Sequence, residues 1–245
     1  AASGMLTQSR VLNNISNNMS NSSTPGYKSD TLATTTFGDM LIERTGNKDK
    51  SVYTPLNNSS MIKTSDELVT DYSEGALQFT DRPLDVAVQG RGFFQIQTPE
   101  GQTLYTRNGS FNVDNEGYLC LQHIGRVLGE GGPIQLGTDK IRIQGDGSIW
   151  HSETSEALGQ IQLTDFTDYA QLQKAGEGMF ENTNGANETP AEGSMTQGAL
   201  ERSNVQAMNE MINMMASQRA FQSAGQMAKI YDELMGRAVE LGSLS

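Results

Sequence analysis

Cysteine, histidine, basic residues and long apolar runs are all scarce in this chain of 245 residues. Its single cysteine, Cys120, excludes an intrachain disulfide. Seventeen basic residues against 29 acidic ones give a net charge of −12, which argues against a nucleic-acid surface, because such surfaces need clustered Lys and Arg. No run of about 18 apolar residues is present, so no membrane-spanning helix is predicted. A hydrophobic content of 36% is low for one compact enzyme core.

Residues for catalysis or metal binding are equally scarce. The two histidines, His123 and His151, lack the spacing of a zinc site. The segments Val113–Tyr118 and Gly145–Gly147 lack the full calcium loop and favour hairpin turns, and Leu128–Pro133 lacks the Lys-Ser/Thr of a phosphate-binding loop. We therefore predict no enzyme activity, no catalytic residues, no metal and no cofactor. Paired carboxylates remain compatible with glycoside chemistry, so a β-rich hydrolase and a secreted β-domain binding module stay open as alternatives.

The amino-terminal stretch predicts a helix with one narrow apolar stripe. Pro25 and Gly26 predict that the helix ends near Ser22. Asparagines are poor helix formers that can hydrogen-bond between close-packed helices and fix their register, which is the role we assign to Asn14, Asn17 and Asn18. Apolar residues at spacings of seven, three and four form the stripe: Met5, Leu12, Ile15 and Met19.

The carboxy-terminal stretch predicts a far longer helix. Ser203 or Asn204 can cap its start, and about 38 residues follow, roughly 57 Å at 1.5 Å per residue. A helix of this length needs partners along its whole length, and the short amino-terminal helix covers only part of it. Its stripe includes Val205, Met208, Ile212, Met215, Met227, Tyr231 and Leu234.

Between the two helices the chain has the pattern of β structure. Residues 31–75 are rich in Thr, Ser and Asn and predict an extended connector with a short strand or two and a turn at residues 44–50. Short apolar runs punctuated by glycine then predict antiparallel strands, with hairpin turns at Pro99–Gly101 and at Asn108-Gly109, where Gly109 would take positive φ. In the pair Phe93-Phe94, one ring should enter the core and the other should pack on the opposite face or contact another subunit.

The predicted fold class is α+β, with a discontinuous helical coiled-coil domain and an inserted, mainly antiparallel β domain. Its parts are the amino-terminal helix within 1–30, the connector 31–75, the β domain 76–194 and the long helix within 195–245. Because the two stripes carry too little apolar surface for an isolated chain, we expect the helices to be poorly ordered in the monomer. Their stripe residues are the predicted subunit interface.

Three segments resemble bacterial flagellar rod and hook proteins. The resemblance is carried by "NNISNNMSNSSTPGYK" (13–28), by the block from "LDVAVQGRGFF" to "GYLC" (84–120) and by "ERSNVQAMNEMINMMASQRAFQ" (201–222). The three segments lie in family order and the similarity spans nearly the whole chain. Two further segments, "RVLGEGGPIQL" (126–136) and "YDELMGRAVELG" (231–242), look more like the proximal rod (FlgF) type than the distal rod (FlgG) type.

The resemblance implies a structural protein of bacterial motility. Such a protein is a subunit of the basal-body rod, an axial drive shaft crossing the periplasm, which self-assembles into a tube and transmits torque; a distal rod or hook-type axial subunit is the nearest alternative. Its implied partners are further copies, other rod proteins, the flagellar type III export apparatus and the rings around the rod. No basic-then-apolar signal is present, so we expect export without a cleaved signal peptide.

Overall fold

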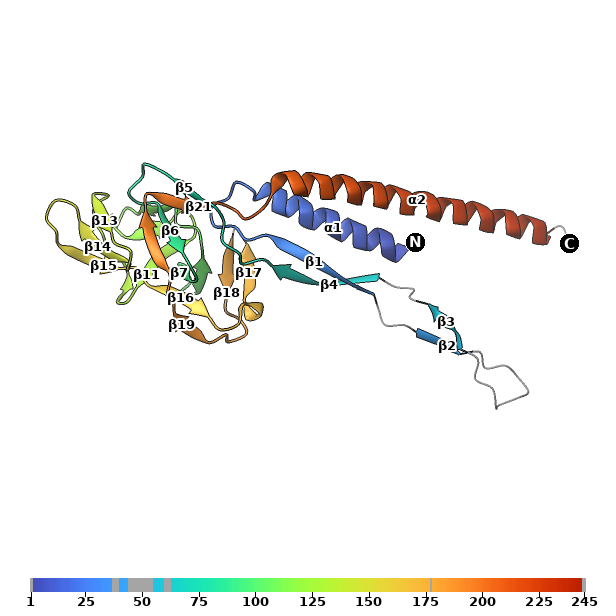
Figure 1. Cartoon of the computed structure of the whole chain (residues 1–245), viewed down its shortest axis with the longest axis horizontal. Coiled ribbons are helices and arrows are strands. Elements are labelled where there is room, and N and C mark those ends of the chain that lie inside the picture. Colours follow the sequence, from blue (N-terminus) through green and yellow to red (C-terminus); the bar gives the residue numbers. More distant parts are fainter. Residues whose placement is uncertain (1, 37–39, 44–54, 60–62, 177, 244–245) are drawn as a thin grey trace. The chain divides into compact units, whose positions relative to one another are not determined.

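The structure is a computed structural model that describes residues 2–36, 40–43, 55–59, 63–176 and 178–243. The chain divides into two compact units. Figure 1 shows both helices, which belong to the first unit, and the many short strands, most of which belong to the second. Unit 1 comprises Ala1–Met19, Asp30–Thr70 and Ala207–Ser245, and unit 2 comprises Ser20–Ser29 and Asp71–Gln206.

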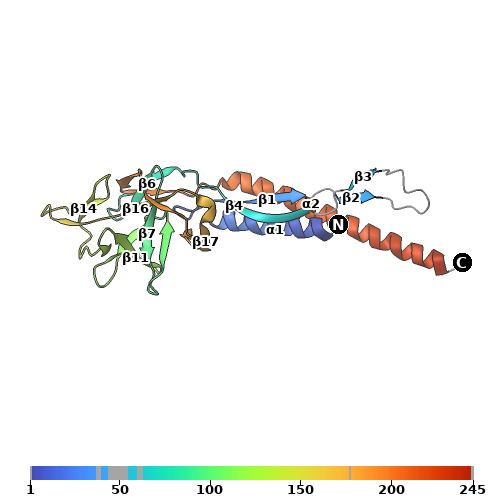
Figure 2. The same ribbon diagram turned by 90° about the horizontal axis from the view of Figure 1, so that it is seen from below.

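The two helices of unit 1 are α1 (Ala2–Ser20) and α2 (Ala207–Ser243). Asn18 Nδ2 lies 3.3 Å from Glu210 Oε1, and a Cβ on Gly225 would lie 4.0 Å from Met5 Sδ. The start of α1 therefore lies beside the middle of α2 and its end beside the start of α2, so the helices run antiparallel and side by side (Figures 1 and 2). The predicted pairing of the terminal helices is therefore seen between α1 and the first half of α2.

Four strands complete the described part of unit 1. They are β1 (Asp30–Thr36), β2 (Met40–Glu43), β3 (Pro55–Ser59) and β4 (Lys63–Thr70). β1 pairs antiparallel with β4, and β2 pairs antiparallel with β3. The β-branched threonines of β1 and β4 favour this extended ribbon, which holds more strands than the one or two predicted for the connector. The turn predicted at residues 44–50 lies outside the described residues.

Unit 2 is built from short strands and one 3₁₀ turn, and its described strand pairings are all antiparallel. This confirms the predicted α+β class with a mainly antiparallel β domain. The elements are β5 (Leu77–Phe79), β6 (Val86–Gln89), β7 (Phe93–Gln97), β8 (Thr103–Thr106), β9 (Phe111–Val113), β10 (Leu119–Leu121), β11 (Gly125–Gly129), β12 (Gly132–Pro133), β13 (Ile141–Ile143), β14 (Ser148–His151), β15 (Ala157–Gln160), β16 (Leu163–Phe166), η1 (Tyr169–Gln171), β17 (Gln173–Gly176), β18 (Met179–Glu181), β19 (Glu188–Pro190), β20 (Ser194–Gln197) and β21 (Ala199–Glu201).

The largest sheet follows the order β17-β18-β8-β7-β11-β10-β9, with β12, β16 and β19 attached at its sides. A second sheet has the order β13-β14-β15, and two ribbons join β20 to β6 and β21 to β5. These ribbons place residues 195–206, which the sequence assigned with the long helix, in unit 2. Their backbone hydrogen bonds to strands more than 100 residues earlier explain the difference.

Adjacent phenylalanines on β7 divide the interior of unit 2 into two apolar clusters. Phe94 packs in the larger one with Phe111, at a ring distance of 5.0 Å, and Phe93 packs in the smaller one with Phe180, at 5.5 Å. Neighbours on a strand face opposite sides, so this confirms that the two rings take opposite faces. Both rings are buried within the unit, so the alternative of a subunit contact by one of them is wrong.

The two predicted hairpins had different outcomes. The turn at Pro99–Gly101 is confirmed, because it joins the paired strands β7 and β8 and Gly101 has φ of 86°. The prediction of a hairpin at Asn108-Gly109 is wrong, because strand β9 pairs with β10 and not with β8. Gly109 has no positive φ; a Cβ there would lie 1.7 Å from the Val86 carbonyl oxygen. Close approach of another strand, rather than turn geometry, therefore requires glycine at this position.

Candidate assembly surface

The apolar stripe of α1 lies partly inside unit 1. Ile15 is buried, and Met5, Leu12 and Met19 are half-buried. Leu6 lies outside the stripe and is exposed. The predicted stripe is thus the better covered side of α1, as the seven, three, four spacing requires of residues on one helix face.

The stripe of α2 is far more exposed than that of α1. Met208 is 74% exposed, and Ile212 and Met215 are also exposed although α1 lies beside this part of the helix. Beyond Gly225, where the start of α1 is reached, Met227, Ile230, Tyr231, Leu234 and Met235 are between 54% and 67% exposed. Large apolar side chains repeated along one helix are typical of a surface that a partner covers.

The start of α2 differs from the prediction. The helix begins at Ala207, so Val205 precedes it and is not its first stripe residue. Asn204 does not cap the helix; its Oδ1 accepts from the Ser29 N–H at 2.8 Å, and its Nδ2 donates to the Asp71 carbonyl at 2.8 Å. The Ser203 hydroxyl accepts from the Val205 N–H. Asn204 instead joins three chain segments of unit 2, which local sequence does not reveal.

Two of the asparagines assigned to register bind the backbone of β1. The Nδ2 groups of Asn14 and Asn18 each donate to the Asp30 carbonyl at 2.8 Å, and Asn18 Oδ1 accepts from the Asp30 N–H at 3.0 Å. Asn18 is buried, so these bonds satisfy polar groups that would otherwise lose their water. Both amides therefore hold the first residue of β1 against α1. A register role between subunits stays a prediction, as it does for Asn17, which is exposed.

Pro25 and Gly26 form the turn that follows α1. Gly26 has φ of +67°, and its N–H donates to the Glu201 carbonyl at 2.8 Å. A Cβ at this position would lie 2.4 Å from the backbone carbon of Arg107. Positive φ and close backbone approach both favour glycine here.

A buried cluster of three charged residues lies next to this turn in unit 2. Lys28 Nζ is 2.6 Å from Glu201 Oε1, and Arg107 Nη1 is 3.3 Å from Glu201 Oε2. The side chains of Lys28 and Glu201 are each 1% exposed. Burial lowers the pKa of Lys28, while the neighbouring carboxylate of Glu201 opposes that shift. Glu201 Oε1 also accepts from the Gly75 N–H at 2.9 Å, so four chain segments meet at one carboxylate.

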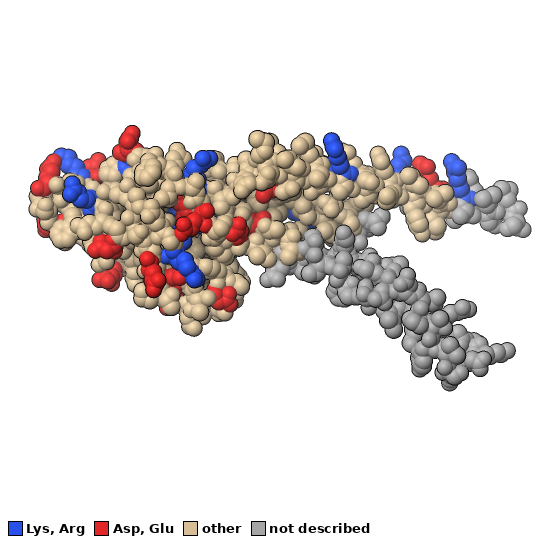
Figure 3. Space-filling view, viewed as in Figure 1, with Lys and Arg blue, Asp and Glu red and all other residues tan. Residues whose placement is uncertain are grey.

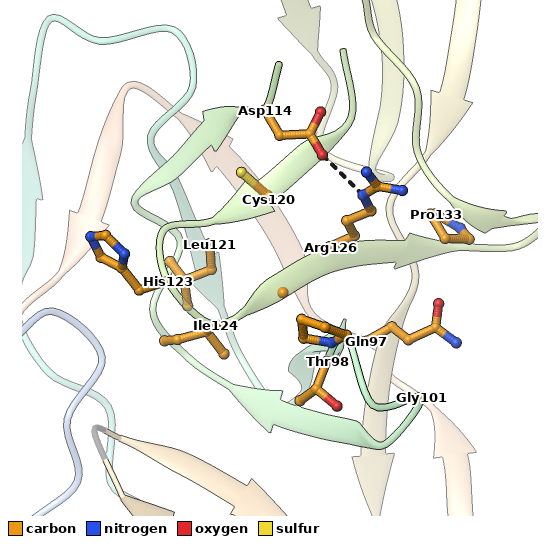
Figure 4. A pocket seen from close by; sticks show the side chains of 12 residues that line it. Gln97, Thr98, Gly101, Asp114, Cys120, Leu121, His123, Ile124, Arg126 and Pro133 are labelled. Carbon is orange, nitrogen blue, oxygen red and sulfur yellow. Dashed lines mark hydrogen bonds and ion pairs between the residues drawn. The ribbon is translucent and has the colours of Figure 1, made fainter. Parts of the chain in front are cut away.

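A hollow of about 720 Å³ lies over strands β7, β10 and β11. In Figure 4, Asp114 and Arg126 point toward one another, and His123 lies on the other side of Cys120, away from this pair. Arg126 binds Asp114, the carboxylate of this lining, at 2.9 Å and also binds Glu116 at 2.6 Å. Paired acids of the kind that a glycoside hydrolase needs are not set up here.

The nucleophiles and acids of this hollow are not activated. The Tyr118 backbone N–H and the Arg126 guanidinium lower the pKa of Asp114, which keeps this carboxylate ionised. Burial raises the pKa of the Cys120 thiol, which keeps it protonated and a weak nucleophile. Within the described residues, no three His, Cys, Asp or Glu side chains are grouped so that they could hold a metal ion.

Comparison with known proteins assigns the same three segments that carried the resemblance. Residues 1–28 match the flagella basal body rod protein family, residues 87–151 the flagellar hook protein FlgE/F/G D1 domain, and residues 196–241 the flagellar basal body rod FlgEFG protein C-terminal region. The chain is 34% identical to FlgG of Bacillus subtilis over 98% of this chain and 96% of that protein. The chain belongs to the flagellar basal-body rod and hook protein family.

Family members of the FlgG type and of the FlgF type are both similar to it. FlgG of Buchnera aphidicola from Schizaphis graminum is 31% identical over 97% of this chain and 96% of that protein. FlgF of Escherichia coli is 32% identical over 100% of this chain and 96% of that protein.

Family membership identifies the chain as a structural protein of the flagellar basal body and not an enzyme. It decides against the hydrolase and the secreted binding module. In the described part of the chain, neither helix is long and apolar enough to cross a membrane.

The buried cluster of Lys28, Arg107 and Glu201 joins the three segments that match the family. Lys28 lies in the first matched segment, Arg107 in the second and Glu201 in the third, so each segment contributes one charge. Reasoning from the sequence did not identify these residues.

Proposed function

We propose that this chain is a subunit of the flagellar basal-body rod that polymerises through its terminal helices into a tubular helical assembly that transmits torque. The observation that carries this proposal is the exposed apolar stripe of α2, which continues beyond Gly225, the position beside the start of α1. Figure 3 supports it, because few charged side chains interrupt the visible surface of this helix. The stripe residues of α1 and α2 are its proposed subunit interface, with the paired helices forming a coiled coil that neighbours complete.

The energy available from the stripe favours several neighbours over one. Full burial of a Met, Ile or Leu side chain contributes about 1.5–3 kcal/mol. Five large apolar residues beyond Gly225 are still between 54% and 67% exposed, so covering the rest of their surface would add about 5–9 kcal/mol. Association itself costs about 4–15 kcal/mol, so one such contact alone is marginal. Repeated contacts that do not close on themselves generate a filament in which each subunit meets several others.

The proposed partners are other copies of this chain and other rod proteins, the flagellar export apparatus that delivers it, and the rings that surround the rod. The proposed location is the part of the basal body that crosses the periplasm. Within the rod, the segments 126–136 and 231–242 favour the proximal, FlgF-type position over the distal or hook-type position.

Placing a carboxylate in the α2 stripe tests the proposed interface. Ile212→Asp is expected to abolish assembly and swimming, because an unpaired charge would be buried between helices. The β domain should keep its circular dichroism spectrum, since Ile212 belongs to unit 1. The measurements are swimming in soft agar and recovery of the variant in purified basal bodies, in cells whose own copy is replaced.

Asn213→Asp is the matched control, because it adds the same charge at the next position, a different angle on the same helix. It is expected to swim at close to the unmodified level. Normal motility of Ile212→Asp, or equal loss in both variants, would contradict an interface along this stripe.

Limited proteolysis of the isolated chain tests whether the helices depend on neighbours. We expect protease to remove α1 and α2 from the dilute monomer well before it cuts unit 2, because the stripe alone offsets little of the ordering cost of about 1–2 kcal/mol per residue. Fragments are identified by mass spectrometry, and chain recovered from purified rods serves as the comparison. Helices as resistant in the monomer as unit 2 would refute coupled folding and assembly.

A further inference from the structure

The chain contains the dipeptide Asn-Gly twice, at Asn108-Gly109 and at Asn184-Gly185. Glycine has no side chain to shield its backbone nitrogen, so this nitrogen can attack the side-chain amide of a preceding asparagine. Asparagine is for this reason a chemically labile residue. The two dipeptides have the same local chemistry, but the fold gives them opposite surroundings.

The first dipeptide, Asn108-Gly109, is held tightly inside unit 2. Asn108 Oδ1 accepts from the Ser110 N–H at 3.1 Å and from the Ser110 hydroxyl at 2.7 Å. Gly109 is buried, and its carbonyl accepts from the N–H groups of Val86 at 3.0 Å and of Phe111 at 2.9 Å. Cyclisation would turn the amide and the backbone toward one another and would break hydrogen bonds of this set. Burial also keeps solvent base away from the Gly109 nitrogen.

The second dipeptide, Asn184-Gly185, lies in a turn between β18 and β19. Both residues are exposed, and Gly185 has φ of 71°. One hydrogen bond holds the Asn184 side chain, from its Nδ2 to the Gln171 carbonyl at 3.2 Å. Within the part of the chain that the structure describes, neither Asn184 Oδ1 nor the Gly185 N–H has a hydrogen-bond partner. Solvent base therefore reaches this turn, and the amide is free to rotate toward the Gly185 nitrogen.

We propose that Asn184 is a site of spontaneous deamidation in the folded chain and that the fold protects Asn108 from the same reaction. The Gly185 nitrogen loses its proton to solvent base and bonds to Asn184 Cγ. The bond from Cγ to Nδ2 breaks, and Nδ2 takes up a proton and leaves as ammonia. One water molecule then opens the succinimide ring to aspartate or isoaspartate, so no oxidant or reductant is needed. The product carries one additional negative charge and no longer donates to the Gln171 carbonyl.

Mass spectrometry of the incubated full chain tests this proposal. The folded chain is kept at mildly alkaline pH in water labelled with heavy oxygen and is then digested with trypsin in ordinary water. Trypsin places the two sites in separate peptides, 108–126 and 175–202. Because the ring opens with water, the label marks only those acids that formed during the incubation. We expect Asn184 to be modified about tenfold faster than Asn108 or more, because Asn108 reacts only after local opening of unit 2.

The chain unfolded in guanidinium chloride is the control, since both dipeptides should then react at similar rates. A faster reaction of Asn108 on unfolding, with little change at Asn184, would support protection by the fold. Equal rates at the two sites in the folded chain would overturn the proposal. So would an Asn184 that reacts in the unfolded chain and stays unmodified in the folded one.

Discussion

Glu201→Ala is expected to lower the free energy of unfolding of unit 2 by about 3–5 kcal/mol, because it leaves two buried cations without their shared anion. Lys28 Nζ would keep only the Ser73 carbonyl, at 2.7 Å, and Arg107 Nη2 only the Gly90 carbonyl, at 2.7 Å. The Gly75 N–H would lose its acceptor as well. The measurement is urea unfolding of the full chain, followed by circular dichroism in the β region.

Glu192→Ala is the control, since Glu192 is exposed and takes part in none of these contacts. It should change the free energy of unfolding by less than about 0.5 kcal/mol. A double-mutant cycle with Lys28→Met should show the double variant less destabilised than the sum of the singles, because the unpaired cation is removed together with the anion. A loss below about 1 kcal/mol for Glu201→Ala would show that water reaches the cluster and screens it.

Gly109→Ala is expected to destabilise unit 2 by about 4 kcal/mol or more, or to prevent its folding. The added methyl carbon would lie 1.7 Å from the Val86 carbonyl oxygen, 2.8 Å from its carbon and 3.1 Å from Phe94 Cε2. Both neighbours are buried, and the Val86 N–H donates to the Gly109 carbonyl at 3.0 Å, so neither strand can move away without losing a hydrogen bond. Soluble yield and urea unfolding measure the effect.

Gly131→Ala separates this contact from the general cost of replacing glycine. Gly131 has no positive φ, and a Cβ there would meet nothing within 4 Å. Alanine at this position is expected to be neutral or to stabilise by up to about 1 kcal/mol through a less flexible unfolded chain. If Gly109→Ala were as stable as Gly131→Ala, the result would contradict the close contact between Gly109 and the Val86 carbonyl.

Local periodicity was enough to predict the elements whose stability depends on near neighbours in the sequence. The three- and four-residue spacing predicted both helices, and the end of α1 at Ser20 lies two residues from the predicted one. Pro99–Gly101 predicted its hairpin, because strands β7 and β8 that it joins are adjacent in the chain and pair with each other. The opposite burial of Phe93 and Phe94 follows from the two-residue period of a strand.

Residues whose partners are distant in the sequence were misassigned or missed. Asn108-Gly109 has the composition of a hairpin turn, but β9 finds its partner in β10 and Gly109 meets Val86 instead. Asn204 has the composition of a helix cap, but its amide binds Ser29 and Asp71. In both cases a contact with a segment distant in the sequence replaced the interaction that the local motif would have made.

The sequence alone predicted an α+β chain with an apolar stripe on the helix at each end, no catalytic residues, and the motifs of the rod and hook family. Helical and strand periods, and the shortage of apolar residues, are properties of the chain that need no partner to be recognised. The meeting of Lys28, Arg107 and Glu201 in one buried cluster is visible only in the folded chain. Such contacts join positions far apart in the chain, and their energies depend on burial, which no local pattern specifies.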